Sequence, residues 1–183
     1  MEGPGTDPLP ASLAAGDGRA FAALYDRFGQ RLFRTAMAVL GRREDAEDTV
    51  QEVFAAVWQA RHGLAGSQDL TAYMFTALRR AAARCAARRA RGPTLSETAI
   101  DEAASPSAPP DDCSATYGER LGRALAALPA EQREVIALKI DGQLTFAQIA
   151  GVLGLSANTA ASRYRYALEK LRASLGRRPK CES

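Results

Sequence analysis

The sequence has few of the residues that build metal sites, disulfides or active sites. It holds one histidine, His62, and three widely spaced cysteines, Cys85, Cys113 and Cys181. Without a CxxC pair or a His–Cys cluster, the sequence predicts no metal, no cofactor and no disulfide framework. It also lacks a nucleophile with an adjacent base, paired catalytic carboxylates and a phosphate-binding glycine loop. We therefore expect a protein that is not an enzyme and has no small-molecule substrate.

Long hydrophobic runs and aromatic residues are scarce as well. No apolar run is long enough to span a membrane, and no basic stretch precedes an apolar one at the N-terminus. We therefore expect a cytoplasmic protein that does not insert into membranes. Aromatic residues make up only 7% of the chain, and alanine supplies much of the 46% hydrophobic content. This composition favours helices, so we expect an all-α fold.

Basic residues are missing from one segment of the chain. Residues 92–116 contain no Arg or Lys, carry a net charge of −5 and hold four prolines, whereas 17–91 and 117–183 each carry a net charge of +5. This pattern predicts two small helical domains, 17–91 and 117–176, joined by an acidic flexible linker over 92–116. We expect residues 1–16, rich in Pro and Gly, to be a disordered leader, and 177–183 to be a basic tail.

Residues 144–175 have the pattern of a helix-turn-helix. Apolar residues at helical spacing form one face of a first helix: Phe146, Ile149, Ala150 and Leu153. Gly154 follows, where a helix needs a left-handed residue to stop, and Ser156 can cap the next helix. Such a motif places its second helix in the major groove of DNA.

The second helix of this motif has a polar and basic face. Its candidate DNA-contacting residues, with the cap, are Ser156, Asn158, Thr159, Ser162, Arg163, Arg165 and Tyr166. The apolar residues Ala160, Tyr164, Ala167, Leu168 and Leu171 fall on the other side. An ordinary helical hairpin with a solvated polar face is the alternative. The glycine turn, the small Ala150 and the basic second helix favour DNA binding.

Two further helices in the first domain carry charge of opposite sign. The expected helix after Arg42 has an acidic face of Asp45, Glu47, Asp48, Gln51 and Glu52, which suits a basic partner. The expected helix over 70–91 has a basic stripe that includes Arg79, Arg80, Arg84 and Arg88, which suits nucleic-acid phosphates. Solvated charged faces are the alternative for both. Tyr73, Phe75 and His62 are candidates for stacking on unpaired bases.

Several short motifs resemble a known family. Tyr25-Asp26-Arg27-Phe28, Gly41 to Asp48, and Val50 to Phe54 with Trp58 look like region 2 of the extracytoplasmic-function sigma factors of bacterial RNA polymerase, in the sigma-70 family. Ala126 to Pro129, Gln132 to Val135, Ile149-Ala150 and Ser162-Arg163 look like region 4. The resemblance covers about residues 18–175, with both regions in order.

This resemblance implies a separate role for each of these helices. The acidic helix would bind core RNA polymerase at its largest subunit, and the helix-turn-helix would read the −35 promoter element. The arginine-bearing helix would read the −10 element and aid melting, and an anti-sigma factor would be a further partner. The residues leave open an alternative, a ligand-responsive helix-turn-helix repressor. A repressor would need a dimer interface and an apolar pocket near the DNA-reading domain.

Overall fold

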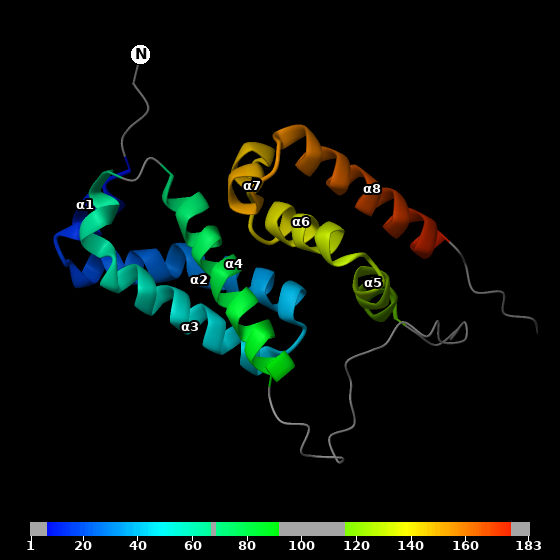
Figure 1. Ribbon diagram of the computed structural model, residues 1–183, viewed down its shortest axis with the longest axis horizontal. Helices are drawn as coiled ribbons and strands as arrows, with labels where there is room; N and C mark the ends of the chain where they lie inside the picture. Colours follow the sequence, from blue (N-terminus) through cyan, green and yellow to red (C-terminus); the bar gives the residue numbers. More distant parts are fainter. Residues whose placement is uncertain (1–6, 67–68, 92–115, 177–183) are drawn as a thin grey trace, which may run out of the picture.

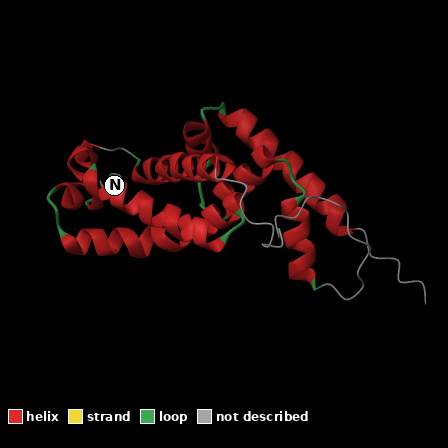
Figure 2. Ribbon diagram, turned by 60° about the horizontal axis from the view of Figure 1, so that its bottom comes forward, coloured by secondary structure: helices red, strands yellow, loops and turns green. Residues whose placement is uncertain are grey.

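The computed structural model describes residues 7–66, 69–91 and 116–176, and over these ranges the regular structure is entirely helical, as expected (Figures 1 and 2). The first half contains α1 (Leu9–Ala14), α2 (Gly18–Leu40), α3 (Arg43–Gln59), the short 3-10 helix η1 (Arg61–Gly66) and α4 (Leu70–Arg91). The second half contains α5 (Tyr117–Ala126), α6 (Ala130–Ile140), α7 (Phe146–Leu153) and α8 (Ala157–Gly176). Across the described residues, no helix is both long and apolar enough to cross a membrane.

Local sequence sets where these helices begin and end. Asp17 caps α2 by accepting a hydrogen bond from the Arg19 amide, and α2 ends at Gly41, which has a left-handed φ of 75°. Threonines precede α5 and α7, and each forms a reciprocal capping box with a residue three positions on, Glu119 or Gln148. These caps satisfy backbone amides that have no partner inside the helix.

The start of the chain differs from the expected leader. Residues 9–14 form α1, which packs against η1 and α2, and the Leu13 side chain is only 1% exposed. Leu9 and Leu13 lie one helical turn apart and cover the same apolar surface. Pro10 fits because it lies in the first turn, where a missing amide hydrogen has no cost. Residues 1–6 lie outside the described part of the chain.

Helices α2, α3 and α4 pack against one another to form the first helical bundle. The most deeply buried large side chains in this bundle are Leu24, Phe28, Leu32, Val53, Val57, Met74 and Phe75. In the second half, α6 packs on α7 and α8, and α5 packs on α8. Here a separate small cluster of Ala124, Leu128, Ile136, Ala167 and Leu171 fixes α5 and α6 to α8.

The two halves are in direct contact. Helix α6 packs against α2, and α7 packs against α4 (Figure 1). Their side chains form one continuous hydrophobic cluster, in which Phe75 of the first half and Val135 and Leu144 of the second are fully buried. The residues alone predicted two regions on a flexible linker and gave no sign of this contact. Apart from Thr116, the linker 92–116 lies outside the described residues, as does the tail 177–183.

Candidate nucleic-acid interface

The helix-turn-helix has the predicted geometry. Gly154 has a φ of 68°, and the Leu155 amide donates to the Ala150 carbonyl at 2.9 Å, which closes the turn. Ser156 caps α8, since its hydroxyl oxygen accepts from the Thr159 amide at 3.0 Å. Ala160 is completely buried, and the rings of Phe146 and Tyr164 meet edge-on at 5.6 Å. Tyr164 therefore fixes α8 to α7 rather than facing a ligand.

The outer face of α8 carries the predicted DNA-contacting residues. Five of them are exposed: Ser156, Asn158, Thr159, Arg165 and Tyr166. The other two, Ser162 and Arg163, are half-buried. Arg163 is held by Glu131 at the start of α6, with 2.7 Å between the guanidinium and the carboxylate. The Arg165 guanidinium lies 5.3 Å from the centre of the Tyr166 ring.

The predicted arginine stripe on α4 is exposed but largely paired. Arg79 pairs with Glu134 of α6 at 3.2 Å, so one predicted DNA contact is held by the second half of the protein. Arg84 pairs with Glu52 of α3 at 2.5 Å, and Arg88 lies 3.9 Å from the same carboxylate. Arg80 is exposed, and no ion pair joins it to another described residue. The stripe is therefore balanced by two acids, Glu134 and Glu52, and the sequence had predicted that Glu52 binds polymerase.

The acidic face of α3 divides into paired and unpaired residues. Asp45 pairs with Arg89 of α4 at 3.4 Å, and Glu47 pairs with Arg43 at 2.7 Å, in addition to Glu52 with Arg84. Asp48 and Gln51 are exposed, and within the described chain neither makes a side-chain hydrogen bond or ion pair. At about 100° per residue these two lie at the centre of the polar face, opposite Val53 and Val57.

A hollow beside this face was missed from the sequence. It has a volume of about 680 Å³ and lies between α2 and α3, where Phe21, Tyr25, Phe54 and Gln51 help to line it. Tyr25 is 57% exposed although its ring packs on Phe54 at 5.0 Å. Sequence periodicity placed Tyr25 in an apolar stripe. Its position at the edge of that stripe, one turn from Phe21, was the available signal.

The three candidate base-stacking residues lie in different environments. Phe75 is completely buried beneath α6 and α7, so the expectation that it could stack on a base is corrected. Tyr73, which helical spacing placed toward the core, is 36% exposed. His62 is exposed in η1. The helical register explains why Phe75 is buried and Tyr73 is exposed. Phe75 lies on the same face of α4 as Leu78 and Ala82, and Tyr73 lies on a different face.

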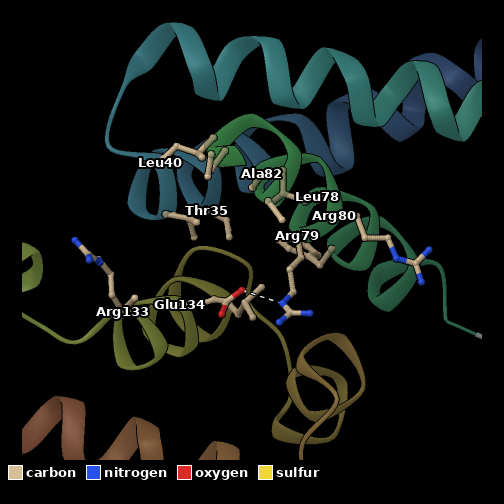
Figure 3. A pocket seen from close by; sticks show the side chains of 15 residues that line it. Thr35, Leu40, Leu78, Arg79, Arg80, Ala82, Arg133 and Glu134 are labelled. Atoms are coloured by element: carbon tan, nitrogen blue, oxygen red, sulfur yellow. Dashed lines mark hydrogen bonds and ion pairs between the residues drawn. The ribbon is translucent and has the colours of Figure 1, made fainter. Parts of the chain in front are cut away.

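A largely apolar pocket lies between the two halves. It has a volume of about 370 Å³, and α2, α4 and α6 supply its walls (Figure 3). Apolar side chains such as Leu40, Leu78 and Leu138 line it, and Arg79 and Glu134 pair across it.

Cys85 of α4 is a buried free thiol. Among the described residues no cluster of three His, Cys, Asp or Glu side chains could hold a metal ion.

The helix-turn-helix, together with the two charged helices, is typical of a helical DNA-binding protein. Family models agree: Sigma-70 region 2 matches residues 24–92, and Sigma-70 region 4 matches residues 118–171. The chain is 32% identical over 160 residues to the ECF RNA polymerase sigma factor RpoE of Cereibacter sphaeroides, covering 85% of this chain and 86% of RpoE. It is 33% identical over 174 residues to SigL of Mycobacterium tuberculosis, covering 90% and 94% of the two chains.

Solved structures show the same fold. CnrH, in complex with the cytosolic domain of CnrY, superposes with a TM-score of 0.63 at 26% identity, covering 92% of this chain and 95% of CnrH. RpoE from Bartonella quintana, in complex with the anti-sigma factor NepR, gives a TM-score of 0.67 at 23% identity, covering 86% and 98%. The second likeness concerns the fold alone.

The chain belongs to the extracytoplasmic-function sigma factors of the sigma-70 family. It directs promoter-specific initiation by RNA polymerase and, like its family, is not an enzyme. Membership excludes the ligand-responsive repressor as its function, although an apolar pocket of the kind a repressor needs is present.

Proposed function

We propose that the exposed face of α8 reads the −35 element of the promoter. Asn158 and Thr159 project from the first turn of α8, next to the turn that positions it, and Arg165 is exposed about two turns further on. Recognition helices of this class use such N-terminal residues at base edges. Arg163 is held at 2.7 Å by Glu131, which fixes its direction before DNA is met. The fixed α7–α8 corner is the observation that supports this assignment most strongly.

We further propose that α4 contacts the −10 element through Arg79, Arg80, Arg84 and Arg88. These side chains are exposed along one face of α4, and their charge suits a phosphate backbone. Because three of the four are paired with carboxylates, phosphates must displace Glu134 and Glu52 to reach them. Arg80 is exposed without such a pair among the described residues, so we assign it the first contact.

Core polymerase is proposed to bind the acidic face of α3: Asp45, Glu47, Asp48, Gln51 and Glu52. Asp48 and Gln51 form its exposed centre, and the hollow edged by Tyr25 lies alongside. An acidic surface next to a partly exposed aromatic ring fits a basic helical partner that also buries apolar area. We therefore add Tyr25 to the proposed polymerase-binding residues, and place the two regions at 17–91 and 117–176.

An anti-sigma protein is proposed as the second partner. CnrH was solved with the cytosolic domain of CnrY, and the Bartonella RpoE with an anti-sigma factor. The chain isolated from its own uninduced cells should then co-elute with one polypeptide that blocks run-off transcription when added back. An active chain without such an inhibitor would contradict this.

We also place the protein in the cytoplasm, where cell fractionation should find it with RNA polymerase.

Site-specific photo-cross-linking tests the residue assignments directly. A photoreactive amino acid at Gln51 should cross-link to the largest polymerase subunit in an initiation complex. The same group at Asn158 should cross-link to −35 DNA, and at Arg80 to −10 DNA. Arg19, an exposed residue near the start of α2, is the control position. A probe at Arg19 should cross-link to neither DNA element. DNA cross-links from Gln51, or polymerase cross-links only from Arg19, would overturn the assignments.

A further inference from the structure

The pocket between α2, α4 and α6 has no part in the promoter and polymerase contacts proposed above. Its volume of about 370 Å³ falls within the usual range of small-molecule sites in proteins, about 300–1,000 Å³. Five alanines help to line it: Ala36, Ala82, Ala83, Ala86 and Ala130. Because a methyl group does not reach the facing helix, these residues leave space between three helices that otherwise pack together.

The end of α2 exposes apolar surface in this pocket. Val39 lines the pocket and is 40% exposed, and the adjacent Leu40 also lines it and is half-buried. Leu78 of α4 and Leu138 of α6 form the pocket on the other two sides. Apolar side chains gathered in one hollow are typical of a site that another molecule covers.

Charged side chains around the pocket carry a net positive charge. Three arginines and one glutamate line it, which gives a net charge of +2. Arg79 and Glu134 pair with each other at 3.2 Å, and Figure 3 shows Arg133 and Arg80 on opposite sides of this pair. Neither Arg133 nor Arg80 forms an ion pair with another described residue. The pocket therefore suits a molecule with an apolar body and a negative charge.

The positive charge is concentrated at the start of α6. Arg133 makes one long hydrogen bond, in which its guanidinium donates to the Ala126 carbonyl at 3.4 Å. Ala130 is the first residue of α6, one turn before Arg133, and no side-chain hydrogen bond caps this helix. The partial positive charge of the helix N-terminus thus adds to that of the guanidinium at the same end of the pocket.

We propose that this pocket binds a single-chain anionic amphiphile, such as a medium-chain fatty acid. The carboxylate lies at Arg133 and the start of α6, and the hydrocarbon chain lies along the alanine-lined walls. The site takes α2 and α4 from region 2 and α6 from region 4, so both regions hold the molecule. An apolar segment of a protein partner is the alternative occupant, but a small pocket with positive charge at one end favours the amphiphile.

Calorimetric titration of the full-length chain with decanoate, below the concentration at which it forms micelles, tests the proposal. Decanoate should bind saturably with one site per chain. Decanol has the same chain without the charge, and it should bind about tenfold more weakly because a charged hydrogen bond is lost. Octanoate should also bind about tenfold more weakly, since it buries two fewer methylene groups. Decyltrimethylammonium should show no saturable binding.

Two variants locate the site. Ala86→Leu adds bulk from an exposed lining position and should weaken decanoate binding at least tenfold. Its matched control is Ala90→Leu, at an exposed position one turn further along α4 that does not line the pocket. Arg133→Gln should weaken decanoate to the affinity of decanol without changing decanol binding. Arg123→Gln, at an exposed position on α5, is its control. Neither control should change either affinity.

Circular dichroism should show unchanged helix content for all four variants. The proposal is overturned if decanoate does not bind saturably, which would leave the pocket to a protein segment. Equal binding of decanoate, decanol and the ammonium compound, or equal effects of each variant and its control, would also overturn it. No polymerase or DNA is present in the titration, so its result is separate from that of the proposed promoter contacts.

Discussion

Glu52 of α3 and Arg84 of α4 form a two-point ion pair: one carboxylate oxygen accepts from the guanidinium Nε at 3.0 Å and from a terminal nitrogen at 2.5 Å. Arg88 approaches the other oxygen of Glu52 at 3.9 Å. A residue proposed to bind polymerase thus neutralises two residues proposed to bind DNA. A basic polymerase surface that competes for Glu52 would release both arginines toward phosphates.

This pairing predicts the behaviour of Glu52→Gln. The free arginines should add phosphate contacts, so the slope of log K against log salt for DNA binding should become steeper by about 1–2. Stability should fall by less than ~1 kcal/mol, because the ion pair is partly exposed. Asp48→Asn removes an exposed acid that has no such pair, and its slope should equal that of wild type. Equal slopes for Glu52→Gln and wild type would contradict the pairing account.

The recognition helix gives a second prediction. Arg163→Ala should weaken binding to the chain's own −35 duplex by about 1–3 kcal/mol, as expected for loss of a base-contacting arginine. Affinity for core polymerase should stay within about twofold, because the partly exposed Arg163–Glu131 pair adds little stability. Arg172→Ala, an exposed arginine near the end of the same helix, serves as control in fluorescence anisotropy titrations. A larger loss of −35 affinity for Arg172→Ala than for Arg163→Ala would place the DNA-contacting face nearer the end of α8.

Two glycines of the helix-turn-helix should respond in opposite directions to alanine. At both Gly151 and Gly154 an added Cβ would meet nothing within 4 Å, so crowding plays no part. Gly154 has a φ of 68°, and alanine there should lower the free energy of unfolding by about 1–2 kcal/mol. Gly151 lies inside α7, where alanine should raise it by about 0.5–1 kcal/mol. Thermal unfolding measures both; two changes of the same sign would rule out this backbone explanation.

Asp141, at the end of α6, predicts a pH dependence. Burial raises its pKa above 3.8, and Arg34 of α2 only partly opposes this. A carboxyl group whose pKa is raised by folding binds more protons in the folded state, so stability falls as pH rises from 3.8 through the raised pKa. At neutral pH the penalty is complete, and Asp141→Asn should therefore raise the free energy of unfolding. Denaturant titrations from pH 4 to 7 should show this gain shrinking toward low pH; a constant gain would refute it.

Sequence patterns predicted the local structure well where residues within one helix or at its ends determine that structure. The glycine stop at 154, the cap at Ser156 and the two faces of α8 follow from helical periodicity and backbone preference. The family, fold and function also followed from motifs, and the comparisons confirm them. The residue-level contacts with DNA and polymerase remain predictions.

What the sequence did not reveal depends on contacts between distant residues. The Arg79–Glu134 and Arg84–Glu52 pairs join residues 55 and 32 positions apart, which no periodicity connects. The burial of Phe75 depends on region 4 covering α4, so its own helix could not predict it. Short helix α1 was missed because residues 1–16, in which it lies, are rich in Pro and Gly like a disordered segment. The Leu13 side chain is buried only through its contacts in the folded bundle.

Run-off transcription with core RNA polymerase on a promoter library tests the central claim most directly. Polymerase with this chain should initiate at a defined set of sequences with paired −35 and −10 elements, and Arg163→Ala should lose the −35 dependence while still binding polymerase. Neither the chain nor core polymerase alone should select any promoter. Failure of the chain to bind core polymerase, or transcription that is equal with and without it, would contradict the account.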